Sequence, residues 1–126
     1  MIHAPIGLPV RRALVVEDEF LVAMLIEDYL RELGVEVVDI ARRLDQGLDR
    51  IERNDFDFAV LDINLAGQVS FPIADRLHAR GIPFIFATAN DRSTLAAPHG
   101  NAPLLSKPFA LSDLERVLGT ADLHMV

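Results

Sequence analysis

The sequence predicts an α/β fold in which a doubly wound, five-stranded parallel sheet forms one domain. Short, dense apolar runs alternate with segments whose apolar residues recur every three or four positions. These are the patterns of strands covered on both faces and of amphipathic helices. The 126 residues suffice for one buried core, and the sequence has no repeat or internal linker. We expect residues 1–10 to form an N-terminal arm and residues 11–126 to form the domain.

The first half of the chain contains two predicted strand–helix units. Residues 13–16 are continuously apolar, which predicts a buried strand. The helix after it is indicated by helically spaced apolar residues, which are Phe20, Leu21, Met24, Leu25, Tyr29 and Leu33. Gly34 offers a stop for this helix. A less uniformly apolar strand is expected at 35–40, nearer an edge of the sheet, before a helix that ends near Asn54.

The second half continues the alternation. The remaining elements are expected as strands at 58–61, 83–88 and 104–106, and as a helix at 71–80. Gly81 closes that helix. Because residues 89–103 contain two prolines and a glycine, only a short, weakly encoded helix is expected there. Ser112 and Glu115 have the spacing of a capping box, which predicts that a final helix opens at Ser112.

The composition disfavours several classes of protein. Acidic residues outnumber basic ones by 19 to 12, which gives a net charge of −7 and disfavours direct binding to nucleic acid. No apolar run approaches the roughly 20 residues that cross a bilayer, so no membrane segment is expected. The absence of cysteine excludes a disulfide framework and a thiolate metal site. These features fit a cytoplasmic protein.

Polar side chains gather where the predicted strands end. They are Glu17 and Asp18 after the first strand, Asp62 and Asn64 after the third, Thr88 at the end of the fourth and Lys107 after the fifth. In open parallel sheets, ligands bind beyond the carboxyl ends of the strands, so these residues are expected on one rim. Carboxylate-rich sites suit Mg²⁺. Asp62 could form an aspartyl phosphate there, while the metal, Lys107 and Thr88 stabilise the charge of the transferring phosphoryl group.

Each of these residues also has an ordinary structural interpretation. The acidic residues 17–19 could simply favour the first turn of the following helix, and Asp62 could be a turn residue. Thr88 is unremarkable at the end of a strand, and Lys107 could be a solvated surface lysine. The occurrence of all these features on separate strand ends favours the functional interpretation.

Four segments resemble the receiver domains of bacterial response regulators, namely ALVVEDE, FAVLDINL, FIFATA and LLSKPF. The resemblance extends over residues 12–118 and implies the flavodoxin-like (βα)5 receiver fold. It also implies that Asp62 is the phosphoacceptor. In the same way, it implies that Glu17 and Asp18 hold Mg²⁺, directly or through water.

The resemblance assigns roles to the other residues of the rim. It implies that the backbone carbonyl of Asn64 reaches the metal, that Thr88 is the switch hydroxyl and that Lys107 pairs with the phosphoryl group. Ala89 corresponds to a small residue that leaves access to the site. The bond between Lys107 and Pro108 is expected to be cis, although only about 5–6% of such bonds are.

Two departures from the usual receiver pattern bear on signalling. Leu104 stands where many receivers have an aromatic residue that couples to the switch hydroxyl, and residues 65–67 replace a familiar Met-Pro. These features resemble the stand-alone receivers with a "FAT GUY" motif, typically associated with histidine kinases of the HWE type, although Asn90 departs from that motif. Asn64 and Asn90 occupy positions that tune dephosphorylation. We expect segment 91–99 to be the movable element.

The resemblance implies a single-domain response regulator that accepts a phosphoryl group on Asp62 from a sensor histidine kinase or histidine phosphotransfer protein. Output is expected through contact with a downstream protein, onward phosphotransfer or a phosphate sink. We expect no enzyme activity beyond assistance of its own phosphorylation and dephosphorylation. One alternative is a haloacid-dehalogenase-like phosphohydrolase, although Asn64 stands where that class needs a second aspartate. The other alternative is a binding module that is never phosphorylated, although the acidic set is complete.

Overall fold

Five parallel strands form the central sheet of the computed structural model, which describes residues 11–89 and 103–124, with side chains as far as residue 118. The strands are β1 (Arg12–Val16), β2 (Val37–Ala41), β3 (Phe58–Leu61), β6 (Phe84–Thr88) and β7 (Leu104–Ser106). They lie in the order β2-β1-β3-β6-β7, and every neighbouring pair is parallel. This order confirms the predicted doubly wound sheet, with β2 at an edge as expected.

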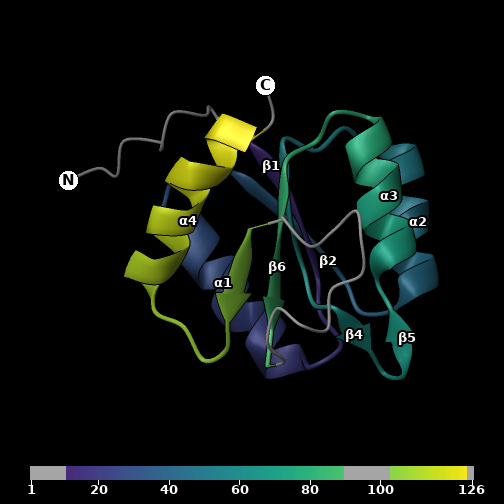
Figure 1. Cartoon of the computed structure of the whole chain (residues 1–126), viewed down its shortest axis with the longest axis horizontal. Helices are drawn as coiled ribbons and strands as arrows, with labels where there is room; N and C mark the ends of the chain where they lie inside the picture. Colours follow the sequence, from purple (N-terminus) through teal and green to yellow (C-terminus); the bar gives the residue numbers. More distant parts are fainter. Residues whose placement is uncertain (1–10, 90–102, 125–126) are drawn as a thin grey trace.

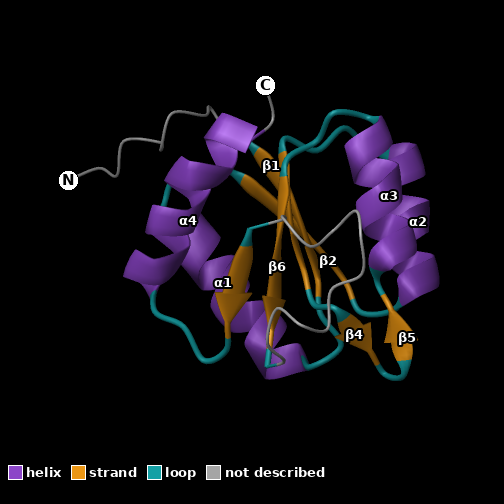
Figure 2. Cartoon of the chain, in the orientation of Figure 1, coloured by secondary structure: helices purple, strands orange, loops and turns teal. Residues whose placement is uncertain are grey.

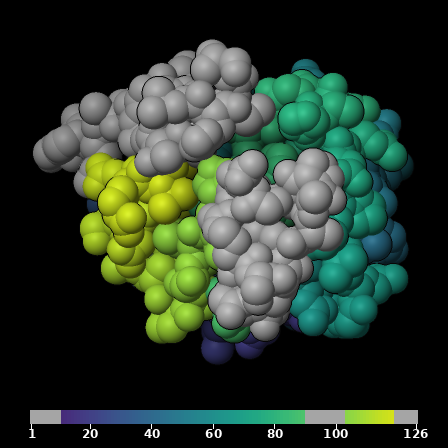
Figure 3. All heavy atoms as spheres, in the orientation of Figure 1, coloured from purple at the N-terminus to yellow at the C-terminus, as the bar shows by residue number. Residues whose placement is uncertain are grey.

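Helices cover both faces of this sheet. The described helices are α1 (Phe20–Glu32), α2 (Leu44–Arg53), α3 (Phe71–Ala79) and α4 (Leu111–His124). α1 and α4 pack on one face, and α2 and α3 pack on the other (Figures 1 and 2). The space-filling view shows the same separation, with the yellow-green atoms of β7 and α4 on one side and the teal atoms of the β4–α3 region on the other (Figure 3). Within the described ranges, no helix is long and apolar enough to cross a membrane.

Two apolar clusters, one on each face, hold the helices to the sheet. Successive residues of a strand point to opposite faces, so a strand covered on both sides must be apolar at every position. Toward α1 and α4 the strands contribute Ala13, Val15, Phe58, Val60, Ile85, Ala87 and Leu105. Toward α2 and α3 they contribute Leu14, Val16, Ala41, Ala59, Leu61 and Phe86. This double burial explains the continuous apolar runs of the sequence.

Some predicted boundaries and elements differ from the structure. β2 begins at Val37 rather than at residue 35. The capping box at Ser112 is wrong, because α4 begins at Leu111 and the Asp113 carboxylate accepts the Ala110 N–H at 2.9 Å. The acidic side chain that closes the first turn is therefore Asp113. The expected arm, the movable segment 91–99 and all of the weakly encoded helix region except its ends lie outside the described residues.

A small antiparallel hairpin that the sequence did not predict follows β3. Its strands are β4 (Asn64–Leu65) and β5 (Gln68–Val69), joined through Ala66 and Gly67. Both joining residues have positive φ, 51° at Ala66 and 92° at Gly67. Positive φ at both central residues is the pattern of a type I′ turn, which usually contains asparagine or aspartate before glycine. Alanine in the first position gave no such signal.

Candidate functional site

Backbone hydrogen bonds that extend the sheet by one residue place three side chains of the site. The N–H groups of Glu17, Asp62 and Lys107 donate to the carbonyls of the last residues of β2, β1 and β6, at 3.0, 2.8 and 2.9 Å. Each of these side chains therefore leaves the chain at the rigid carboxyl end of a strand. The three lie on one rim of the sheet, as the sequence predicted.

Three carboxylates converge on this rim. One oxygen each from Glu17, Asp18 and Asp62 lies within 4.8 Å of the others. Glu17 is only 1% exposed and Asp62 only 7% exposed, so water screens their mutual repulsion poorly. A dense group of carboxylate oxygens is the donor set that a hard divalent cation takes. The donor chemistry of the site therefore fits the predicted Mg²⁺.

Lys107 bridges two of the carboxylates. Its Nζ lies 2.6 Å from Glu17 Oε1 and 3.3 Å from Asp62 Oδ2. The sequence predicted Lys107 beside the phosphoacceptor but not its shorter contact with Glu17. Three carboxylates against one ammonium leave a formal charge of −2 at this cluster. A divalent cation would balance that charge.

Burial and charge shift the protonation of the cluster. Burial raises the pKa of Glu17 to about 7; the hydrogen bond from Lys107 opposes this shift, and the negative charge of Asp62 adds to it. Burial also raises the pKa of Asp62, against the lowering effect of the Lys107 charge. Burial acts to lower the pKa of Lys107, but Glu17 and Asp62 together outweigh it, so this pKa is raised. Without a metal, the site thus retains protons that isolated carboxylates would release.

The unpredicted hairpin forms one wall of the site. The Ala66 N–H donates to Asp18 Oδ2 at 3.1 Å, and the Gly67 N–H donates to Asn64 Oδ1 at 2.9 Å. The Asn64 side chain therefore holds the turn, and as an amide it cannot supply the acidic proton that a phosphohydrolase of the haloacid-dehalogenase type needs. The Asn64 N–H also approaches Asp62 Oδ1 at 3.4 Å.

An open cavity of about 310 Å³ lies over the acidic residues. Thr88, which is 1% exposed, and the exposed Ala89 line it together with Asp62 and Lys107. The structure thus brings the proposed nucleophile, hydroxyl and ammonium to one cavity. Asn90, the other position predicted to tune dephosphorylation, lies outside the described residues.

Leu104 lies away from this cavity. It is half-buried among the apolar residues of the α2–α3 face, and in the sheet register it pairs with Phe86. The rings of Phe71 and Phe84 lie 5.9 and 5.5 Å from that of Phe86. The bond between Lys107 and Pro108 is cis, as predicted.

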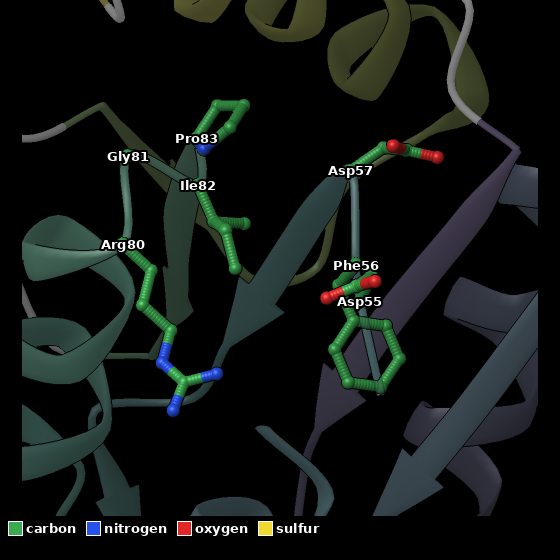
Figure 4. Close-up of a pocket in the computed structure, with 7 residues that line it drawn as sticks. All are labelled: Asp55, Phe56, Asp57, Arg80, Gly81, Ile82 and Pro83. Atoms are coloured by element: carbon green, nitrogen blue, oxygen red, sulfur yellow. The ribbon is translucent and has the colours of Figure 1, made fainter. Parts of the chain in front are cut away.

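A second hollow, of about 530 Å³, lies at the opposite end of the sheet, before β3 and β6 (Figure 4). Two of the polar side chains that line it, Asp57 and Arg80, have structural partners. Asp57 accepts the N–H groups of Arg11 and Arg12, and Arg80 donates to the carbonyl of Ile51. Figure 4 shows the side chains of Asp57 and Arg80 pointing away from each other. Among the residues that the structure describes, no cluster of carboxylates like that of the acidic rim lies there.

This topology and this acidic rim define a class of protein. Residues 13–118 match the response regulator receiver domain, so the chain belongs to the receiver domain family of response regulators. The predicted fold and family are therefore confirmed. The cluster of Glu17, Asp18 and Asp62 is the acidic triad typical of a receiver Mg²⁺ site.

Several known proteins resemble the chain closely. It is 36% identical to SdrG from Sphingomonas melonis Fr1, with a TM-score of 0.80 over 89% of this chain and 96% of SdrG. It is 33% identical to PhyR from Brucella abortus, with a TM-score of 0.78 over 93% of this chain and 49% of PhyR. The transcriptional regulatory protein PdtaR of Mycobacterium tuberculosis H37Rv is 31% identical over 82% of this chain. The chain spans about half (53%) of the length of PdtaR.

Proposed function

We propose that this chain is a phosphoacceptor receiver of a response regulator. It accepts a phosphoryl group on Asp62 from a phosphohistidine of a sensor histidine kinase or histidine phosphotransfer protein, and it requires Mg²⁺. The observation that carries the proposal is the position of Asp62, almost buried at the end of β3 with Lys107 Nζ at 3.3 Å and two further carboxylates beside it. A lone surface aspartate has no such surroundings.

The proposed reaction transfers the phosphoryl group between two side chains. An ionised oxygen of Asp62 attacks the phosphorus, the phosphorus–nitrogen bond of the phosphohistidine breaks, and the imidazole leaves with the bonding electron pair. The product is a mixed anhydride on Asp62. Burial raises the pKa of Asp62, so the neighbouring ammonium of Lys107 is needed to favour the ionised nucleophile.

The remaining residues of the rim would orient and stabilise the phosphoryl group. Lys107 and Thr88 both line the cavity beside Asp62. Lys107 would pair with one phosphoryl oxygen, and the Thr88 hydroxyl would donate to another. Glu17, Asp18 and the Asn64 carbonyl would hold Mg²⁺ together with Asp62. When bound, Mg²⁺ supplies positive charge that stabilises the transferring group.

Relatives support this function and suggest its setting. A BeF₃-activated conformation of SdrG, from Pseudomonas melonis Fr1, is 37% identical to this chain with a TM-score of 0.75. Another similar structure is that of the PhyR stress response regulator. We infer that kinases of a stress response are the first partners to test, followed by kinases of the HWE type. Output through contact with a downstream protein, onward phosphotransfer or a phosphate sink belongs to the same proposal.

Phosphotransfer from radiolabelled candidate kinases tests the function. We expect rapid, Mg²⁺-dependent labelling of the wild type by its cognate kinase and no labelling of Asp62→Asn. Asp55→Asn is the matched control, because Asp55 is an exposed aspartate at the opposite end of the sheet. Undiminished labelling of Asp62→Asn would refute the assignment. Absence of labelling by every phosphorylated kinase and phosphotransfer protein would favour a receiver that acts only as a binding module.

A further inference from the structure

Asp18 is held by contacts that come from outside the acidic triad. Its Oδ2 accepts the Ala66 N–H at 3.1 Å, from the hairpin on one side. Its main-chain carbonyl accepts a hydrogen bond from Arg42 Nη2 at 3.1 Å, from the β2–α2 loop on the other side. The first contact orients the carboxylate, and the second anchors the backbone that carries it.

The Arg42 contact continues the β1–β2 ladder. The last registered pair of these strands is Val16 with Ala41, and the Glu17 N–H then donates to the Ala41 carbonyl at 3.0 Å. One residue further along each strand, the contact is made by a side chain, because the guanidinium of Arg42 donates to the Asp18 carbonyl. A side chain thus provides the contact that the sheet no longer provides.

Arg42 is itself held in place on two sides. Its guanidinium carbon lies 5.5 Å from the centre of the Phe20 ring, within the range of a cation–π contact. Its own N–H donates to Gln46 Oε1 at 2.8 Å, which ties the loop to the first turn of α2. These contacts restrict the rotamers of a long, exposed side chain, so its hydrogen bond to Asp18 costs less conformational entropy.

We propose that Arg42 is a positioning residue for the Mg²⁺ ligand Asp18, acting through its hydrogen bond to the Asp18 carbonyl and its packing on Phe20. The inference rests on the Mg²⁺ site of the proposed function. Arg42 itself would touch neither the metal nor the phosphoryl group. It keeps the β1–α1 turn in the conformation that presents the Asp18 carboxylate beside Glu17 and Asp62.

Because Arg42 is charged, its replacement can either strengthen or weaken Mg²⁺ binding, and the direction of the change tests the proposal. A cation close to an acidic site repels Mg²⁺, so loss of its charge alone should tighten metal binding. Loss of positioning should weaken metal binding instead. Arg43 is the matched control, because it is the next residue and equally charged, but its side chain pairs with Asp45 at 3.2 Å.

The experiment measures Mg²⁺ binding by titration of backbone amide NMR signals in the wild type, Arg42→Ala and Arg43→Ala, at about pH 8, above the pKa of Glu17. We expect Arg42→Ala to bind Mg²⁺ roughly three- to tenfold more weakly, the equivalent of losing one exposed hydrogen bond to a fixed group. We also expect its metal-free spectrum to show a shifted Ala66 amide, because that group donates to Asp18. Arg43→Ala should bind equally well or more tightly, with the Ala66 amide unmoved.

Equal or tighter Mg²⁺ binding by Arg42→Ala would overturn the proposal, and so would an equal loss in both variants. Thermal unfolding without Mg²⁺ serves as a check, because a global loss of structure would lower the midpoint of Arg42→Ala well below that of Arg43→Ala. In that event, Phe20→Leu, which keeps the arginine but removes the ring, must weaken Mg²⁺ binding if the proposal holds. If the wild type itself did not bind Mg²⁺, the proposed function would fail together with this inference.

Discussion

At the scale of the residue, the ion pair between Lys107 and Glu17 governs the charge of the site. The two groups are 14% and 1% exposed, and their atoms lie 2.6 Å apart. Removal of one partner from a buried pair leaves the other charge uncompensated, which costs far more than removal of an exposed pair. We therefore expect Lys107 to stabilise the protein as well as the proposed reaction.

We predict that Lys107→Met lowers the free energy of unfolding by about 3 kcal/mol at about pH 8 without Mg²⁺. The loss should shrink at about pH 5.5, because Glu17 is then protonated and carries no charge to compensate. Urea denaturation of the wild type and the variant measures the loss in free energy of unfolding at each pH. Arg53→Met is the control, since its exposed pair with Asp49 should contribute less than about 0.5 kcal/mol at either pH. An equal loss for Lys107→Met at both pH values would show that the charge of Glu17 does not cause it.

The protonation of Glu17 also determines how the free energy of unfolding of the wild type changes with pH. Burial raises its pKa from an ordinary 4.5 to about 7 in the folded protein, so the folded state binds more protons between these values. The contribution of this proton to stability is complete below pH 4.5 and is lost as the pH rises through about 7. Mg²⁺ should offset this loss, because the metal takes the place of the proton.

At the scale of the element, the close approach of α2 to α3 depends on Gly47. A Cβ added there would lie 2.5 Å from Ile73 Cδ1 and 3.5 Å from Val16 Cγ2. Glycine costs a helix about 1 kcal/mol relative to alanine, so its presence inside α2 has a packing reason rather than a helical one. The contact holds both helices against the same face of the sheet.

We predict that Gly47→Ala destabilises the protein by about 1 kcal/mol, because overpacking outweighs the gain in helix propensity. Ile73→Val removes the obstructing methyl group, so Gly47→Ala should become neutral or stabilising in that background. Chemical denaturation of the four members of this double-mutant cycle gives the coupling energy. A stabilising Gly47→Ala in the wild-type background would contradict this prediction, because it would show that the Ile73 side chain makes room for the added methyl group.

Some elements could be predicted from the sequence and others could not. The strands were predictable because each is buried on both faces, and double burial leaves an unbroken apolar run. The β4–β5 hairpin was not predictable, because its strands have two residues each and because Ala66, at positive φ, is not a residue that usually indicates such a turn. The start of α4 was misplaced because Ser112 and Asp113 both carry capping groups, and only the backbone geometry decides between them.

At the scale of the whole molecule, the topology places the site. The order of the sheet changes direction between β1 and β3, and both strands end at the acidic rim. This is why residues that are far apart in the sequence could be predicted to meet. The pair of Lys107 with Glu17 and the contact of Arg42 with Asp18 were not predicted, because they depend on side-chain reach rather than on topology.

Intact-protein mass spectrometry can determine whether Asp62 accepts the phosphoryl group. The protein is incubated with acetyl phosphate or phosphoramidate, with Mg²⁺ or with a chelator. We expect the wild type and the exposed-site control Asp55→Asn to gain the mass of one phosphoryl group only with Mg²⁺, and Asp62→Asn to gain none. A full mass gain by Asp62→Asn, or no gain by the wild type with either donor, would contradict this expectation.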